Sequence, residues 1–127
     1  MIEDLCSLAD VILFSAAIPR QGGTEHINEQ WQSYWAAQFR KHGYVAYDVV
    51  RPMVWADERV KWWYQQNTLA YANSNAAQLF SGYRPCEMLD AVHRDLWEYS
   101  AGLRYVVKQF PGAVSRAVKK VISGALT

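Results

Sequence analysis

The side chains best suited to catalysis or binding gather in one short stretch, QGGTEHINEQ, between residues 21 and 30. His26 is the candidate general base, because an imidazole titrates near neutral pH and can accept a proton from a substrate or orient a nucleophilic hydroxyl. Glu29 follows in the same stretch and is the second catalytic candidate. The candidates for contact with a substrate flank these two residues and are Gln21, Gly22, Gly23 and Gln30. The glycine pair lets a ligand approach the backbone closely.

The same residues also fit a purely structural role. Asn28 is a favoured residue at a helix N-terminus, and a glutamate at position 29 suits the positive end of a helix. Thr24 and His26 would then hold the loop through local hydrogen bonds. The two glycines are equally typical of an ordinary turn. The sequence leaves both interpretations open.

The stretch lies between a predicted strand and a predicted helix. The continuous apolar run Val11–Phe14 predicts a strand buried on both faces, as in a parallel sheet. A loop over residues 17–28 follows, and Asn28–Lys41 places apolar side chains at helical spacing until Gly43 ends the helix. Open α/β sheets bind ligands beyond the carboxyl ends of their strands, so this loop is the expected site.

Two more strands and one more candidate residue are predicted after the helix. Tyr44–Val50 is expected as a strand that ends at an Arg-Pro pair. Val60–Ala72 is rich in aromatic side chains and predicts a strand paired with the preceding one, with Trp62 and Trp63 facing opposite sides. Arg51 lies at the turn and is the candidate for an anionic substrate such as a nucleotide-sugar phosphate. The alternative for Arg51 is a solvated loop charge.

Charge and cysteine usage exclude several classes of protein. The 13 Lys and Arg against 12 Asp and Glu leave a formal charge of +1, so no nucleic-acid partner is expected. Cys6 and Cys86 lie far apart without a CxxC pair, and the histidines have no other ligand at metal-binding spacing, so we expect neither a disulfide framework nor a metal site. No run reaches the roughly 18 apolar residues of a membrane span. Glu3 and Asp4 stand where a signal peptide would be basic, which favours a cytoplasmic protein.

Residues 74–127 differ in composition from residues 1–73 and predict a helical C-terminal extension after a partial α/β domain. Helical segments are expected within residues 76–80, 86–99, 102–110 and 113–125. Residues 94–127 carry six basic and two acidic side chains, whereas residues 1–93 carry seven basic and ten acidic ones. Binding to a membrane surface is not expected, because the three basic residues of the last segment give marginal anchoring.

Two long and uncommon sequence motifs indicate a resemblance to a known family. They are FSAAIPRQGGTEHINEQW, which begins at Phe14, and VKWWYQQNTLAY, which begins at Val60. Together they resemble the C-terminal half of class I S-adenosylmethionine-dependent methyltransferases. The resemblance implies a Rossmann-like sheet in which these 127 residues provide strands five to seven. It also implies that the last strand runs antiparallel between the other two.

The resemblance further implies methyl transfer from S-adenosylmethionine to an oxygen, nitrogen or carbon of a small molecule or glycan precursor. In that family the cofactor is held by a glycine-rich turn after the first strand and an acidic residue after the second. The seven glycines of this chain form no GxG, so roughly the N-terminal half of the family's domain has no counterpart here. We therefore expect a truncated enzyme, one part of a split enzyme or the C-terminal part of a larger protein, which binds the cofactor poorly by itself.

A second class of function remains open. The chain is alternatively a non-catalytic interaction module that dimerises or binds a partner chain through its sheet edge and basic tail. A sheet that lacks its remaining strands has an unprotected edge, so we expect either a homo-oligomer or pairing with a complementary N-terminal methyltransferase half.

Overall fold

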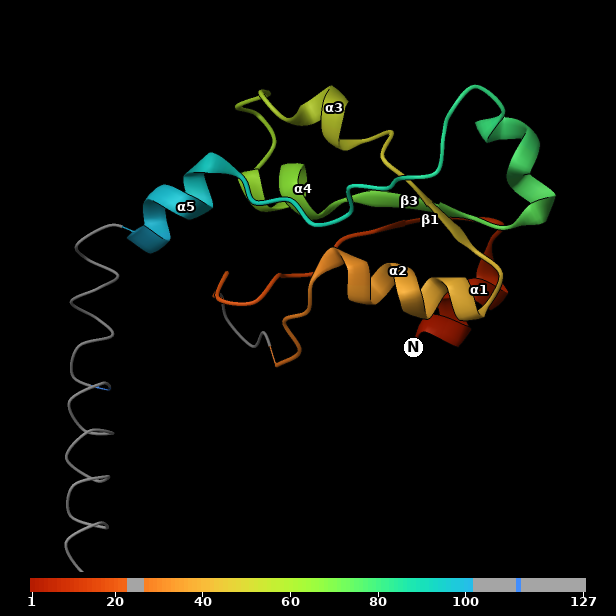
Figure 1. The fold of residues 1–127 in the computed structure, drawn as a ribbon, viewed down its shortest axis with the longest axis horizontal. Helices are drawn as coiled ribbons and strands as arrows, with labels where there is room; N and C mark the ends of the chain where they lie inside the picture. Colours follow the sequence, from red (N-terminus) through yellow and green to blue (C-terminus); the bar gives the residue numbers. More distant parts are fainter. Residues whose placement is uncertain (23–26, 102–111, 113–127) are drawn as a thin grey trace, which may run out of the picture. The chain divides into compact units, whose positions relative to one another are not determined.

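The computed structural model of the chain describes residues 1–22, 27–101 and 112. It shows a small mixed α/β fold with an open three-stranded sheet (Figure 1). The elements, in chain order, are helix α1 (Ile2–Leu8), strand β1 (Val11–Phe14), helix α2 (Gln32–Lys41), strand β2 (Val45–Tyr47), helices α3 (Arg51–Val54) and α4 (Trp62–Asn67), strand β3 (Leu69–Ala72), the 3₁₀ helix η1 (Ser74–Phe80) and helix α5 (Arg94–Ala101).

The last strand of the sheet lies between the first two. The strand order is β1-β3-β2, and β3 is antiparallel to both neighbours. In the register, Ile12 and Ala46 both lie opposite Tyr71. The two outer strands are therefore parallel to each other, and their carboxyl ends meet the start of β3 at one end of the sheet. The expected antiparallel direction of the last strand is confirmed.

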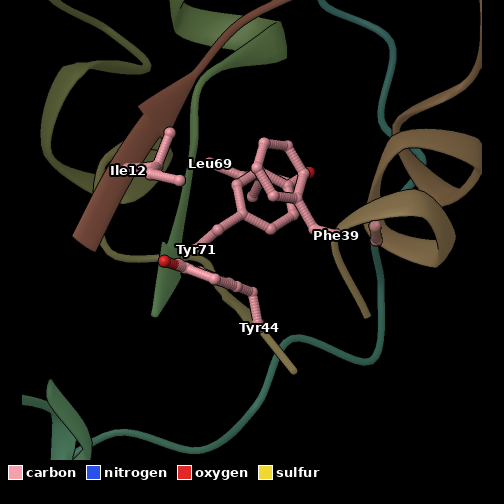
Figure 2. Close-up of a cluster of buried hydrophobic side chains, with 6 residues drawn as sticks. Ile12, Phe39, Tyr44, Leu69 and Tyr71 are labelled. Atoms are coloured by element: carbon pink, nitrogen blue, oxygen red, sulfur yellow. The ribbon is translucent and has the colours of Figure 1, made fainter. Parts of the chain in front are cut away.

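Helices α1 and α2 cover one face of the sheet (Figure 1). The main core lies beneath them and contains Ile12, Ala36, Phe39, Tyr44, Leu69 and Tyr71. The rings of Phe39 and Tyr71 stack on each other, as Figure 2 shows, and their centroids lie 4.0 Å apart. The Tyr44 hydroxyl donates to the Ala9 carbonyl at 2.7 Å, which satisfies its polar end while the ring stays buried.

The opposite face of the sheet is covered less completely. Helix η1 packs there against Ala70 and Ala72, and Phe80 stacks on Tyr47 with centroids 4.4 Å apart. Leu13 also belongs to this face, because side chains alternate along a strand, and it remains 65% exposed. The prediction that Val11–Phe14 is buried on both faces is therefore wrong for this position: only the central strand β3 is buried throughout.

Helix α2 begins three residues later than the sequence predicts. Its N-cap is Trp31, and the predicted cap Asn28 instead accepts a hydrogen bond from the Gln30 side chain. The cap of α2 comes from a distant residue: Asp90 accepts from the Ser33 backbone N–H at 2.8 Å and from the Ser33 hydroxyl at 2.9 Å. A carboxylate at this end of a helix satisfies free N–H groups and matches the helix dipole.

The end of α2 follows the prediction. Gly43 adopts a φ of 81°, in the left-handed region that favours glycine. The backbone N–H groups of Gly43 and Tyr44 donate to the carbonyls of Arg40 and Phe39, which is the Schellman arrangement. Strand β2 then starts directly at Val45 and is shorter than predicted.

The predicted strand Val60–Ala72 is wrong over its first part. Residues Trp62–Asn67 form helix α4, and only Leu69–Ala72 is a strand. Trp62 and Trp63 do not face opposite sides, because their rings pack edge to face at 5.4 Å. In the helix, the adjacent side-chain amides of Gln66 and Asn67 are buried together and form hydrogen bonds. In a strand, neighbouring side chains would point to opposite faces of the sheet.

The chain divides into two compact units, Met1–His93 and Arg94–Thr127. The sequence composition assigned residues 74–93 to the C-terminal extension, but the structure places them in the same unit as the sheet. Within them, residues 86–93 are not helical. In the second unit the structure describes α5, in which Arg94 lies 3.5 Å from Glu98. The helices expected within 102–110 and 113–125 lie outside the described residues. Among the described helices, none has the length and apolar character to cross a membrane.

Candidate functional site

The candidate site lies at the end of the sheet where β1 and β2 finish and β3 starts. The terminal pairs of the two ladders are Phe14 opposite Leu69 and Tyr47 opposite Ala70. The loop after β1, the turn after β2 and helix α4 therefore meet at this end. The buried polar side chains of these segments are Gln21, Arg51, Gln65, Gln66 and Asn67.

Gln21 joins the loop after β1 to helix α4. Its side-chain oxygen accepts from the Asn67 amide at 2.8 Å, from the Gln66 amide at 3.2 Å and from the Ile18 backbone N–H at 3.2 Å. The side chains of Gln21, Gln66 and Asn67 are all buried. Loss of the Gln21 oxygen would leave buried N–H groups without an acceptor, which would lower the stability of the fold. The network therefore fixes the start of the loop against the sheet.

Glu29 folds the loop back on itself. Its two carboxylate oxygens accept from the backbone N–H groups of Arg20 and Gly22, each at 2.8 Å. Arg20 and Gly22 adopt φ values of 71° and 68°, and the backbone N–H groups of these two residues, which flank Gln21, point to one carboxylate. Left-handed backbone is strained for a residue with a side chain, so the carboxylate compensates for the conformation of Arg20. Glu29 thus has a clear structural role.

The other loop candidates are only partly described. Gln30 donates its backbone N–H to the Ala17 carbonyl at 3.1 Å, which closes the loop at its base. His26 and Gly23 lie outside the described residues, so their predicted roles stay predictions. Of the predicted site residues, the structure brings Gln21, Gly22 and Glu29 together in one turn of the loop.

Two buried polar atoms near this end of the sheet have no hydrogen-bond partner among the residues that the structure describes. The Gln32 amide nitrogen donates to the carbonyls of Ala91 at 3.0 Å and Gln66 at 3.4 Å, but its oxygen has no donor. The Trp35 indole N–H has no acceptor. The two residues are three apart in α2, which places them on one side of the helix. A small group that both donates and accepts, such as a hydroxyl or a water molecule, has the chemistry to satisfy such atoms.

Arg51 is buried beside the turn after β2. Its guanidinium forms a bidentate pair with Asp48, with distances of 2.9 and 2.8 Å, and donates to the carbonyls of Leu89 at 2.7 Å and Met88 at 2.9 Å. This is the arrangement of a structural arginine, and an anionic substrate would have to displace one of these acceptors. Burial raises the pKa of the neighbouring Cys86 thiol, and the positive charge of Arg51 offsets part of that effect.

Sequence reasoning missed the amide residues that hold the site. Gln66 receives a hydrogen bond from the His93 backbone N–H at 2.7 Å, and its own amide donates to Asn67 at 2.8 Å. The sequence carries these residues as the run Gln65-Gln66-Asn67, but amide side chains are mostly exposed in proteins, so the run alone does not indicate burial. Taking residues 60–72 as one strand also hid their position at the end of a helix.

The described residues do not fit S-adenosylmethionine. Asp48 is an acidic residue just after a strand, but both of its oxygens bind Arg51. The converging N–H groups of the loop are taken by Glu29. The sequence offers no glycine-rich turn of the GxG type. The part of the chain described by the structure also contains no group of three or more His, Cys, Asp or Glu side chains placed to hold a metal ion.

A comparison of the chain with protein-family models, with curated proteins and with solved structures finds no match.

Proposed function

We propose that the chain is the carboxyl-terminal part of a class I methyltransferase sheet and forms the substrate side of the active site. The observation that carries the proposal is the strand order: an antiparallel β3 lies between the parallel strands β1 and β2. This is the order that the sequence resemblance implies for strands five, seven and six. The polar loop after β1 supports the proposal, because ligands of open α/β sheets bind beyond the carboxyl ends of strands.

In this proposal the residues of the chain orient the substrate. Gln21 and Glu29 hold the loop in place from its two ends. His26 belongs to the same loop and accepts a proton on an imidazole nitrogen from the substrate hydroxyl or amine. Such a fixed loop would contribute mainly through alignment of the reacting groups. In this proposal the complementary N-terminal half holds the cofactor, because the described residues of this chain do not fit it.

The test is to recover the complementary part and measure binding. A tagged chain is purified from its own cells, and the co-purifying protein is checked for a strand followed by a glycine-rich turn. Isothermal calorimetry should show S-adenosylmethionine binding to the complex and none to the chain alone. Micromolar binding to the chain alone would mean that the fold holds the cofactor in another way and would overturn the proposal.

His26→Ala in the active complex tests the role of the loop. We expect turnover to fall much further than the melting temperature, because the substitution removes a proton acceptor and leaves the hydrogen bonds of Gln21 and Glu29 intact. Equal losses of turnover and of thermal stability would support the structural interpretation of this stretch instead.

A second function is favoured by a different observation. Strand β1 is an edge strand with an exposed leucine, which is the property of an interaction module that pairs through its sheet. The oligomeric state of the chain in solution tests this alternative.

A further inference from the structure

The hydrogen bonds of the sheet determine which backbone groups of β1 point outward. The Asn73 N–H donates to the Asp10 carbonyl at 3.1 Å, so these two residues form a hydrogen-bonded pair of the antiparallel ladder. Hydrogen-bonded pairs recur at every second residue, which directs the backbone of Ile12 and Phe14 toward β3. The N–H and C=O groups of Val11 and Leu13 therefore point away from the sheet.

The other edge of the sheet is already closed. The same alternation directs the backbone of Ala46 in β2 away from β3, and its carbonyl accepts from the Cys86 N–H at 2.8 Å. Among the described residues, no backbone hydrogen bond closes the edge of β1 in this way. The sheet has one open edge and one blocked edge.

The open edge also lacks the features that prevent strand pairing. Natural edge strands are protected by charged side chains, proline or bulges. The segment Val11–Phe14 contains none of these, and Leu13 is 65% exposed. Both the hydrogen-bonding groups and the apolar side chain at this edge are available to a second strand.

We propose that two copies of the chain pair through their β1 strands, antiparallel and centred on Ile12. In this register Val11 lies opposite the partner's Leu13, and Leu13 lies opposite the partner's Val11. Each of these pairs exchanges two hydrogen bonds, so all four outward groups of both strands are used. The exposed Leu13 side chain packs beside the partner's Val11 on the same face of the sheet.

A second copy fits this edge because the edge is self-complementary. The two outward residues are two positions apart, so a twofold axis at the residue between them brings each onto the other. No like charges meet, because Asp10 lies opposite the partner's Phe14 rather than the partner's Asp10. The blocked edge of β2 stops further addition, so the assembly ends at two copies with one continuous sheet. The dimer uses the edge that a complementary methyltransferase half would also need, so this inference rests on the interaction-module alternative and not on the methyltransferase proposal.

Light scattering coupled to size exclusion tests the proposal with the full chain. We expect twice the 14.6 kDa chain mass at tens of micromolar for the unchanged protein. Leu13→Lys places a charge on the edge and should give the monomer mass. The control is Leu79→Lys, because Leu79 is similarly exposed at 74% but lies in η1. A monomeric unchanged protein, or a dimer that persists in folded Leu13→Lys, overturns the proposal.

Engineered cysteines test the register and do not depend on the dimer being lost. A Val11→Cys chain mixed with a Leu13→Cys chain should form an intermolecular disulfide, because directly opposed residues have Cα separations within the range a disulfide spans. Each variant alone should crosslink far less, since its engineered cysteine faces an unchanged residue. Equal crosslinking in the mixture and in the separate variants would refute this register.

Discussion

Replacing Arg51 by methionine separates a structural arginine from a substrate-binding one. The Arg51 side chain is only 4% exposed and binds Asp48 through both carboxylate oxygens. It also donates to the carbonyls of Met88 and Leu89, which belong to the segment that returns along the sheet. Arg51→Met keeps much of the volume and removes every one of these donors.

The expected loss follows from the groups left behind. Removing one partner of a buried ion pair costs about 3–5 kcal/mol, because the other charge stays without compensation. Asp48 is 30% exposed and keeps part of its hydration, so the lower end of that range applies to the pair. The carbonyls of Met88 and Leu89 together add only about 1 kcal/mol, because Met88 is 83% exposed and water can replace the lost donor. We expect a loss of about 4 kcal/mol in the free energy of unfolding, a large share of the about 5–15 kcal/mol typical of a domain.

Urea unfolding followed by tryptophan fluorescence measures this loss. With a denaturant dependence of about 2 kcal/mol per molar urea, the midpoint should fall by about 2 M. The matched control is Arg59→Met. Arg59 forms the same kind of pair with Asp57, at 2.9 and 2.7 Å, but its side chain is 89% exposed. The control should leave the midpoint nearly unchanged, because exposed pairs contribute little.

The two variants together decide the role of Arg51. If Arg51→Met lowers the midpoint no more than Arg59→Met, the buried pair does not hold the turn, and the structural assignment of Arg51 is refuted. A stable Arg51→Met protein that has lost binding of an anionic substrate would support the role predicted from the sequence.

Three more expectations concern the loop and the pH dependence. Glu29→Ala should speed hydrogen exchange at the Gly22 amide while exchange in β3 stays slow, and unchanged protection of Gly22 would argue against the role of this carboxylate. Burial raises the pKa of both the Cys86 thiol and the Tyr71 hydroxyl. The folded chain therefore holds these two protons more tightly than the unfolded chain, and the stability that this gives is lost as pH rises above the ordinary pKa values. Urea midpoints should therefore fall from about pH 8.5 upward and less steeply in Cys86→Ser, and parallel curves would contradict this. Asparagine side chains lower the pKa of Asp10, so stability is lost as pH falls below about 4, and Asp10→Asn should show a weaker acid dependence in the same titration.

The sequence alone determined the elements that rest on local signals. Strand β1 has the predicted bounds, and Gly43 ends α2 as predicted. An apolar run and a glycine in the left-handed region act through the backbone of a few neighbouring residues, so no distant contact is needed to read them. The loop after β1 was predicted for the same reason.

The tertiary structure decided where polar groups are buried. Helix α2 starts where Asp90 caps it, and Asp90 is 57 residues from Ser33. Residues Trp62–Asn67 are helical, and in this form Gln66 and Asn67 reach the oxygen of Gln21. A buried amide is stable only with its partners, and a helix cap needs its acceptor; in this fold both kinds of partner lie far away in the sequence. Local propensity therefore could not choose between strand and helix at this segment, and the hydrogen bonds of the folded chain did.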